Sequence, residues 1–260
     1  CPTAKPSGGR GILAASNPRW STAPVTARSL LQDAACTRVV ALHLDALEAD
    51  FELLDSEERA RAVRFATPLL QRRFIAAHTA LRRLLGWATA QPAQSLRIVA
   101  DALGKPVLAD VPDLHFSLSH CGGQALLALD SAPVGIDIEA LIQRDTEVLA
   151  RQILAPTELE RWRRAPLAHR VELLTESWTR KEAALKACGL GLRTDPASFE
   201  AAEGELELAH GGRFLLRTLA AAPGHCAALA QTPPARPLCL LRLLPAQQLQ
   251  HASLEAGSAA

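Results

Sequence analysis

The sequence predicts an α+β protein made of two similar α/β halves, related by pseudo-twofold symmetry, with the active site at their interface. Three observations support this fold class. The order of predicted strands and helices repeats along the chain, the two longest predicted helices carry matching residues, and the strands that precede them also match. With 260 residues, the chain is long enough for one large domain or two small ones with a buried core.

The first half opens with an alternating apolar and polar segment at 40–45, which predicts a β-strand. Acidic residues follow Asp55 in segment 54–65, a pattern typical of the first turn of a helix. Segment 72–86 is predicted as a longer helix that ends at Gly86, because glycine commonly follows the last helical residue. Further strands are expected at 96–101, 114–120 and 124–130.

The second half repeats this order. Segment 134–139 again alternates and predicts a strand. A helix at 155–164 is expected to begin with Thr157 and Glu160 in capping-box spacing. A longer helix is expected at 176–189, ending at a glycine. Strands are then expected at 198–204, 205–219 and 225–231.

The two long helices share a residue pattern: Phe74-x-x-x-His78-x-Ala80-Leu81-Arg82 corresponds to Trp178-x-x-x-Glu182-x-Ala184-Leu185-Lys186. In the preceding strands, His43 and Asp45 correspond to Asp137 and Glu139. An internal duplication with a spacing of roughly 100 residues accounts for both matches. Chance similarity between two helices rich in Ala, Leu and Arg is the alternative explanation.

The repeat also sets the expected boundaries. Residues 1–35 are rich in Pro, Ser, Gly and Ala, which predicts a poorly ordered arm. Residues 36–132 are assigned to the first half and residues 133–245 to the second. Residues 246–260 are expected to form a flexible tail.

Composition limits the classes of function. The net charge of +1 gives no general reason to expect nucleic acid or an anionic membrane as partner. No apolar run is long enough to cross a membrane, and no signal-peptide pattern opens the chain, so a cytoplasmic protein is expected. The six cysteines show no metal-binding spacing and are expected to be free thiols. Only four of the 28 basic residues are lysines, which hints that some lysines lie where a compact ammonium is needed.

Asp137 and Glu139 are unusual in an otherwise apolar strand. Two residues apart, both carboxylates point to the same face. At ~7 Å and an effective dielectric constant near 20, they repel by roughly 2 kcal/mol. Glu182 lies at the edge of the apolar stripe of its helix, with Lys186 one turn beyond. Three carboxylates aimed at one place favour Mg²⁺, which takes oxygen ligands and binds substrate phosphates. The alternatives are a solvated strand end and an ordinary surface ion pair.

Ser119 and His120 end the segment FSLSH and precede a glycine turn. Ser, His and nearby backbone N–H groups suit phosphate oxygens, although a structural Ser-His turn is the alternative. A Ser-His nucleophilic pair is not expected, because adjacent strand residues point to opposite faces. Lys105, in the turn segment LGKP, is the third candidate in this region.

The ordered set GKP, HFSLSH, GIDIE and WTRKEAALKACGLG resembles the 4′-phosphopantetheinyl transferase superfamily. The monomeric, double-length type that activates surfactin-type peptide synthetases and polyketide synthetases is the best match. The motifs span residues 103–191, and a weaker RF…RRF…AH…LR pattern extends the match back to about residue 53. Beyond residue 192 the similarity rests on element order.

The resemblance implies a holo-[acyl-carrier-protein] synthase that transfers the phosphopantetheine arm of coenzyme A to a serine of an apo acyl or peptidyl carrier protein, releasing 3′,5′-ADP. It implies that Asp137, Glu139 and Glu182 hold Mg²⁺, with Mn²⁺ as the alternative. It makes Glu182 the general base and Lys186 the contact to the diphosphate, so that Glu182, Lys186 and Asp137 are the expected catalytic residues.

By the same resemblance, His120 and Ser119 contact the diphosphate, while Lys105, Arg73 and Arg61 meet the phosphates of the nucleotide. One departure concerns Glu58, where the family often has a basic residue, with Arg59 or Arg64 as the alternative source of that charge; it puts the 3′-phosphate contacts in doubt and not the reaction. A monomer is implied, with no nucleic acid or membrane partner. Candidates for docking the acidic carrier lie on the helix at 155–164 and just before it: Arg151, Arg161, Trp162, Arg163 and Arg164. An ordinary solvated basic face is the alternative.

Two rival functions use the same residues. One is a Mg²⁺-dependent phosphodiesterase or nucleotide hydrolase, which requires no carrier. The other is a non-catalytic module that binds coenzyme A, which the intact base and lysine disfavour.

Overall fold

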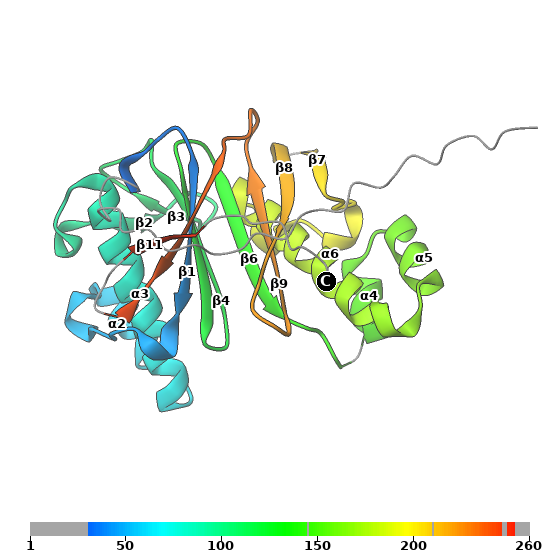
Figure 1. Cartoon of the computed structure of the whole chain (residues 1–260), viewed down its shortest axis with the longest axis horizontal. Coiled ribbons are helices and arrows are strands. Elements are labelled where there is room, and N and C mark those ends of the chain that lie inside the picture. Colours follow the sequence, from blue (N-terminus) through cyan, green and yellow to red (C-terminus); the bar gives the residue numbers. More distant parts are fainter. Residues whose placement is uncertain (1–30, 145, 210, 246–248, 253–260) are drawn as a thin grey trace, which may run out of the picture.

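Two β-sheets lie back to back at the centre of the protein, and one long helix covers the outer face of each (Figure 1). This computed structural model describes residues 31–144, 146–209, 211–245 and 249–252. The α+β class expected from the sequence is confirmed.

The first sheet has five strands in the order β11-β10-β1-β5-β4. Its strands are β1 (Thr37–His43), β4 (His115–Cys121), β5 (Gln124–Asp130), β10 (Leu238–Leu243) and β11 (Leu249–Ala252). The pleat of β1 sends Val40 and Leu42 toward helix α3, whereas Val39 faces the second sheet. The other elements of this half are η1 (Leu44–Ala46), η2 (Phe51–Leu53), α2 (Ser56–Ala62), α3 (Pro68–Thr89), η3 (Ala93–Ser95) and the hairpin of β2 (Ile98–Ala100) and β3 (Pro106–Leu108).

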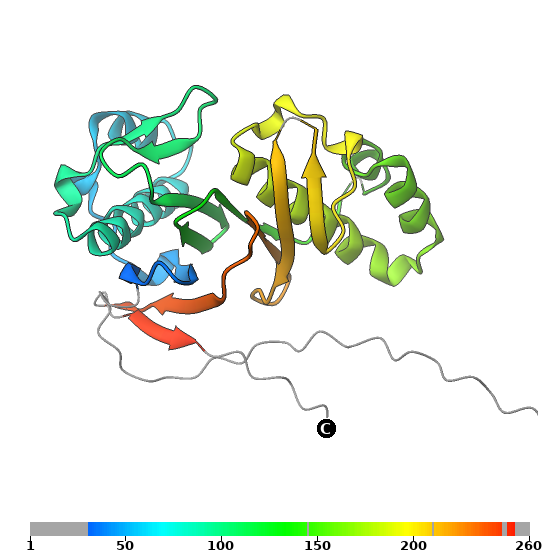
Figure 2. The same ribbon diagram turned by 90° about the horizontal axis from the view of Figure 1, so that it is seen from above.

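The second sheet has four strands in the order β6-β9-β8-β7. They are β6 (Val134–Ala140), β7 (Gly204–Leu208), β8 (Gly212–Leu219) and β9 (His225–Gln231). Helix α6 (Leu167–Cys188) packs on this sheet, with α4 (Thr146–Ile153) and α5 (Pro156–Arg164) on its far side (Figures 1 and 2). Two short 3₁₀ turns, η4 (Gly191–Arg193) and η5 (Pro196–Ser198), follow α6.

The two halves correspond in topology. The strand order β1-β5-β4 in the first sheet corresponds to β6-β9-β8 in the second. Neighbouring strands are antiparallel in both sets. Helices α3 and α6 are both 22 residues long. Asp45 departs from the expected match, because it lies in the turn η1 and not on a strand. The pseudo-twofold axis itself stays a prediction.

Some element boundaries differ from the sequence-based expectation. Helix α3 continues through Gly86 to Thr89, and a Cβ at position 86 would come within 2.8 Å of the Gln91 carbonyl oxygen. Gly86 therefore does not end the helix. It leaves room for the chain that folds back against the helix at Gln91. Helix α5 begins at Pro156, and Glu158, not Glu160, accepts from the backbone N–H at its start. Segment 198–204 forms no strand except at its last residue.

The chain crosses the expected domain boundaries. Residues 1–30 of the predicted arm lie outside the described residues, but Leu31 is fully buried in the first core. Strand β10, assigned to the second half, pairs in parallel with β1 of the first sheet. Strand β11 lies within the predicted tail and pairs with β10. Within the described part of the chain, no helix has the length and apolar character to cross a membrane.

Side chains of β4 join the two sheets at one edge. Three alternate side chains of β4 accept hydrogen bonds from amides of β6: Ile136 N–H to Ser117 Oγ (3.1 Å), Ile138 N–H to Ser119 Oγ (3.4 Å) and Ala140 N–H to Cys121 Sγ (3.3 Å). The alternating small polar residues of this segment thus replace a backbone ladder between the halves. The same contact brings Ser119 next to Asp137.

Candidate active site

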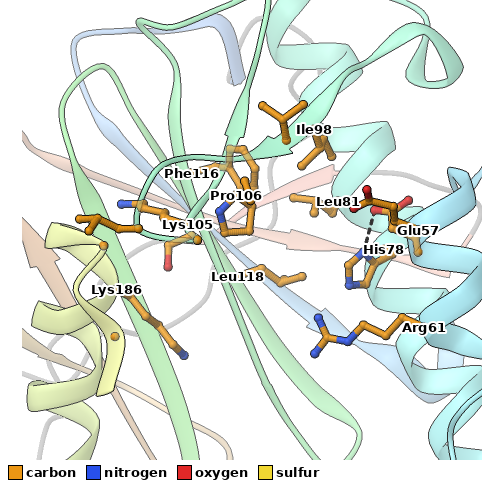
Figure 3. Close-up of a pocket in the computed structure, with 18 of the residues that line it drawn as sticks. Glu57, Arg61, His78, Leu81, Ile98, Lys105, Pro106, Phe116, Leu118 and Lys186 are labelled. Carbon is orange, nitrogen blue, oxygen red and sulfur yellow. Dashed lines mark hydrogen bonds and ion pairs between the residues drawn. The ribbon is translucent and has the colours of Figure 1, made fainter. Parts of the chain in front are cut away.

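A cavity of about 620 Å³ lies between the two halves. Residues of α2, α3, the β2–β3 hairpin and β4 form one side, and the C-terminal end of α6 with Gly189 and Gly191 forms the other. Figure 3 shows Arg61 and Lys186 entering this cavity from opposite sides. Of the residues predicted from sequence, Arg61, Lys105, His120 and Lys186 line it.

Lys186 connects the cavity to the carboxylates behind it. Its Nζ donates to Asp137 Oδ1 at 2.6 Å and to Ser119 Oγ at 2.9 Å. Ser119 Oγ in turn donates to the same Asp137 oxygen at 2.7 Å. Asp137 is 1% exposed, whereas the Lys186 side chain is 30% exposed. One buried carboxylate, a hydroxyl and an ammonium that reaches solvent therefore form a connected set.

Glu139 and Glu182 complete the acidic group that the sequence predicted. Burial, and then the charge of Asp137, raise the pKa of Glu139. Burial also raises the pKa of Glu182, and the charges of Asp137 and Glu139 add to this rise, while Lys186 opposes it. The charge of Asp137 thus raises the pKa of both glutamates, and the charge of Glu139 raises that of Glu182, as expected for acids that share one region.

The donor set fits a divalent cation. Asp137 Oδ2 is buried and has no hydrogen-bond partner among the described residues. Mg²⁺ prefers oxygen ligands. A buried carboxylate oxygen without a partner, next to two acids with raised pKa values, suits such an ion. Across residues 31–144, 146–209, 211–245 and 249–252, no group of three His, Cys, Asp or Glu side chains is placed so that it could hold a metal ion as it stands, so the fit rests on the chemistry of these oxygens.

The opposite wall supplies cations that point into the cavity. The Arg61 guanidinium lies 5.3 Å from the centre of the Phe74 ring and faces Lys186 (Figure 3). His120 also lines the cavity. Burial lowers the pKa of His120 below its ordinary value, and the charges of His78, Lys186 and Arg61 lower it further. Because Arg61 and Lys186 both line the cavity, its positive charge suits an anionic ligand.

Two predicted phosphate-binding residues are engaged elsewhere. Arg73 forms a two-pronged ion pair with Asp45, with distances of 2.8 and 2.6 Å, and does not line the cavity. Lys105 lines the cavity wall, but its Nζ donates to the carbonyl oxygens of Val134 and Ala187. Burial lowers the pKa of Lys105 to about 8.

The sequence did not predict the role of His78, which it placed only as the counterpart of an acidic residue. In the structure His78 lines the cavity, stacks on Phe74 with ring centres 4.1 Å apart, and bonds to Glu58 through Nδ1 at 2.8 Å. Glu58 also accepts from the buried Arg82 at 2.6 Å. The helical spacing of His78 and Arg82 on α3 was the available signal.

Glu58, at the position where the motif resemblance led us to expect a basic residue, therefore belongs to a structural network at the cavity wall. Burial favours its neutral form, but hydrogen bonds from His78, the Asp55 backbone and Arg82 outweigh this and lower its pKa. The position adds a compensated negative charge next to Arg61 and no free cation.

The basic face expected to dock a partner is largely neutralised. Arg151 and Arg163 both pair with Glu147, Arg161 pairs with Glu200, and Arg164 pairs with Glu160. Trp162, expected on this surface, is 4% exposed and packs in a small core. Lys181 is fully buried and pairs with Glu158 at 2.6 Å, which makes it a structural residue.

Comparisons with known proteins agree with this arrangement. Residues 133–239 match the sequence profile of the 4′-phosphopantetheinyl transferase superfamily. The chain is 31% identical over 161 residues to the 4′-phosphopantetheinyl transferase psf-1 of Bacillus pumilus, covering 62% of this chain and 66% of that protein. It is 31% identical over 158 residues to the 4′-phosphopantetheinyl transferase Sfp of Bacillus subtilis, covering 56% of this chain and 70% of Sfp.

The chain belongs to the 4′-phosphopantetheinyl transferase superfamily. The resemblance drawn from the motifs is thereby confirmed, including its Sfp-like type. A further relative, the 4′-phosphopantetheinyl transferase HetI of a Nostoc species, is 39% identical over 145 residues, which cover 54% of this chain and 61% of HetI. The chain thus spans less than two thirds of the length of psf-1 and HetI in these matches.

Proposed function

We propose that this protein transfers the 4′-phosphopantetheine arm of coenzyme A to a serine of an apo carrier protein and releases 3′,5′-ADP. The observation that carries the proposal is the contact between Lys186 and Asp137, which joins an anion-binding cavity to a group of three carboxylates. Coenzyme A offers phosphates to such a cavity and a diphosphate to such a junction. The named activity of psf-1, HetI and Sfp supports the same reaction.

Each residue has a role that follows from its surroundings. We assign the diphosphate to the ammonium of Lys186 and to His120, and the nucleotide phosphates to Arg61, because these groups line the cavity. Ser119 keeps the Lys186 ammonium in place through its hydroxyl. Glu182 receives the proton of the carrier serine, and its raised pKa brings it closer to neutral pH, where a general base works best.

We further propose that Asp137, Glu139 and Glu182 hold Mg²⁺, with Mn²⁺ as the alternative. When bound, the ion supplies charge neutralisation at the diphosphate oxygens. The residues themselves contribute the buried unpartnered oxygen of Asp137 and the carboxylates of Glu139 and Glu182, whose pKa values burial and the charge of Asp137 raise.

For the carrier protein we propose an apolar hollow of about 410 Å³ beside the carboxylates. Its lining residues are Ile142, Leu149, Gln152, Ile153, Trp178 and Pro196. The Trp178 indole N–H lies 3.4 Å from Glu139 Oε1, so the hollow adjoins the proposed reaction centre. This surface replaces the arginine face, whose charges are paired. The protein is proposed to act as a monomer in the cytoplasm.

One experiment separates this function from its rivals. The protein is incubated with coenzyme A, Mg²⁺ and an apo acyl or peptidyl carrier protein, and the intact carrier is weighed by mass spectrometry while nucleotide products are followed by chromatography. A phosphopantetheine mass gain on the carrier with equal release of 3′,5′-ADP is expected. Cleavage of coenzyme A without a carrier would indicate a phosphodiesterase, and binding without any product would indicate a non-catalytic module.

A further inference from the structure

Lys105 lies on an exposed turn of the first half, but the end of its side chain binds to the second half of the protein. Its Nζ donates to the Ala187 carbonyl oxygen at 2.9 Å and to the Val134 carbonyl oxygen at 3.2 Å. Its aliphatic stem lies beside Gly189, where an added Cβ would be 3.5 Å from Lys105 Cβ. In Figure 3 the side chain extends toward β6 and α6, away from Arg61 and His78.

These contacts fall at the end of α6. Ala187 directly follows Lys186 in the last turn of the helix, and Gly189 ends it with a φ of +74°. The last carbonyl groups of a helix have no partner within the helix, and a lysine ammonium satisfies them and matches the negative end of the helix dipole. Lys105 thus caps the helix that carries Lys186.

The turn that presents Lys105 is itself fixed. The backbone N–H groups of Leu103 and Lys105 both donate to Asp101 Oδ1, at 2.8 and 2.9 Å. Lys105 therefore links a rigid turn in the first half to the start of β6 and the end of α6 in the second. The cavity lies between these elements, so this link sets their separation.

We propose that Lys105 is a positioning residue, which acts on transfer through α6 and Lys186 and does not bind the phosphates of the nucleotide. This inference rests on the proposed function for its kinetic test. The ammonium has two backbone partners in the second half, and a phosphate contact requires it to give up both. Loss of the ammonium frees the last turn of α6 and moves Lys186, and misplacement by about 1 Å costs on the order of 100-fold in rate.

The test compares Lys105→Met, which keeps the stem but removes the charge, with Arg61→Met, which removes a cavity cation. Three quantities are measured for each variant. The first is amide hydrogen exchange in the ligand-free protein, read from peptides that cover residues 134–138 and 186–191. The others are the Kd for 3′,5′-ADP by calorimetry and kcat per folded molecule. Lys105→Met is expected to speed exchange in both peptides and lower kcat by 10- to 100-fold, with a Kd change below about threefold.

Arg61→Met is expected to show the opposite pattern, with unchanged exchange and a Kd raised on the order of tenfold. Unchanged exchange in Lys105→Met together with a tenfold weaker Kd would show a phosphate ligand and overturn the proposal. Faster exchange with an unchanged kcat would show a purely structural residue and also overturn it. Should Lys105→Met not fold, Lys105→Gln carries the same test. A wild-type protein without transfer activity contradicts the proposed function, whereas the exchange and 3′,5′-ADP measurements still decide whether Lys105 binds phosphate.

Discussion

The close approach of α6 to β6 at Gly135 gives the sharpest test of how the site is assembled. A Cβ at this position would lie 2.0 Å from the Ala183 carbonyl oxygen, 2.4 Å from the Ala187 amide nitrogen and 3.0 Å from the Ala187 Cα. All three are backbone atoms of α6, so no side chain can turn away to make room. Gly135→Ala must therefore move the helix away from the strand.

The required movement sets the expected effect. Relieving the contact from 2.0 Å to even 3.0 Å takes about 1 Å of helix displacement. This displacement carries Glu182 and Lys186 away from Asp137, which now lies 2.6 Å from the Lys186 ammonium. We expect kcat for transfer to the carrier to fall on the order of 100-fold. Overpacking of this kind costs about 1–3 kcal/mol, and the Tm should fall by about 2–4 °C for each kcal/mol.

The assay is carrier mass spectrometry under single-turnover conditions, with thermal unfolding followed by circular dichroism. Gly123→Ala is the matched control, because its Cβ would meet the end of the Asp45 side chain at 2.8 Å, which can rotate away. Its effect on both quantities should be small. If Gly135→Ala transfers within a few-fold of wild type and melts at the same temperature, the packing of α6 on β6 does not position the catalytic groups.

Other predictions address the acids. Glu182→Gln should keep the fold but reduce transfer at least ~100-fold, since it removes the proposed base and a metal charge; activity within a few-fold of wild type contradicts the assignment. In Asp137→Ala, the affinity for coenzyme A measured by calorimetry should become nearly independent of Mg²⁺, and strong Mg²⁺ enhancement there would exclude β6 as the metal site. Glu139 and Glu182 have pKa values raised above 4.5, so the metal-free folded state holds protons that the unfolded chain has released. Stability without metal should therefore fall as pH rises through the interval above 4.5, and Mg²⁺ should raise the Tm more at about pH 7.5 than at about pH 5. An equal Mg²⁺ effect at both pH values would show that these acids do not hold the ion.

The sequence by itself determined the parts that depend on local geometry. The pleat of a strand has a period of two, so the alternation within the segment was enough to place Asp137 and Glu139 on one face. The helical period likewise placed Glu182 next to Lys186, and an acidic N-cap placed the start of α2 at Asp55. Strands β5 and β9 have the bounds that their apolar runs predicted. The ordered motifs determined the family, because their spacing carries more information than any one of them.

Only the tertiary structure decided which partner each long polar side chain reaches. Lys105 and Arg73 looked alike in the sequence as cations near the nucleotide, yet one is bound to two carbonyl oxygens of the other half and the other to Asp45. The sequence also could not predict that β10 joins the first sheet, because a parallel pairing between residues about 200 apart leaves no local pattern. His78 joined the cavity through packing of α3 against α2. Such contacts depend on the relative placement of whole elements, which the burial of both cores sets and no short segment encodes.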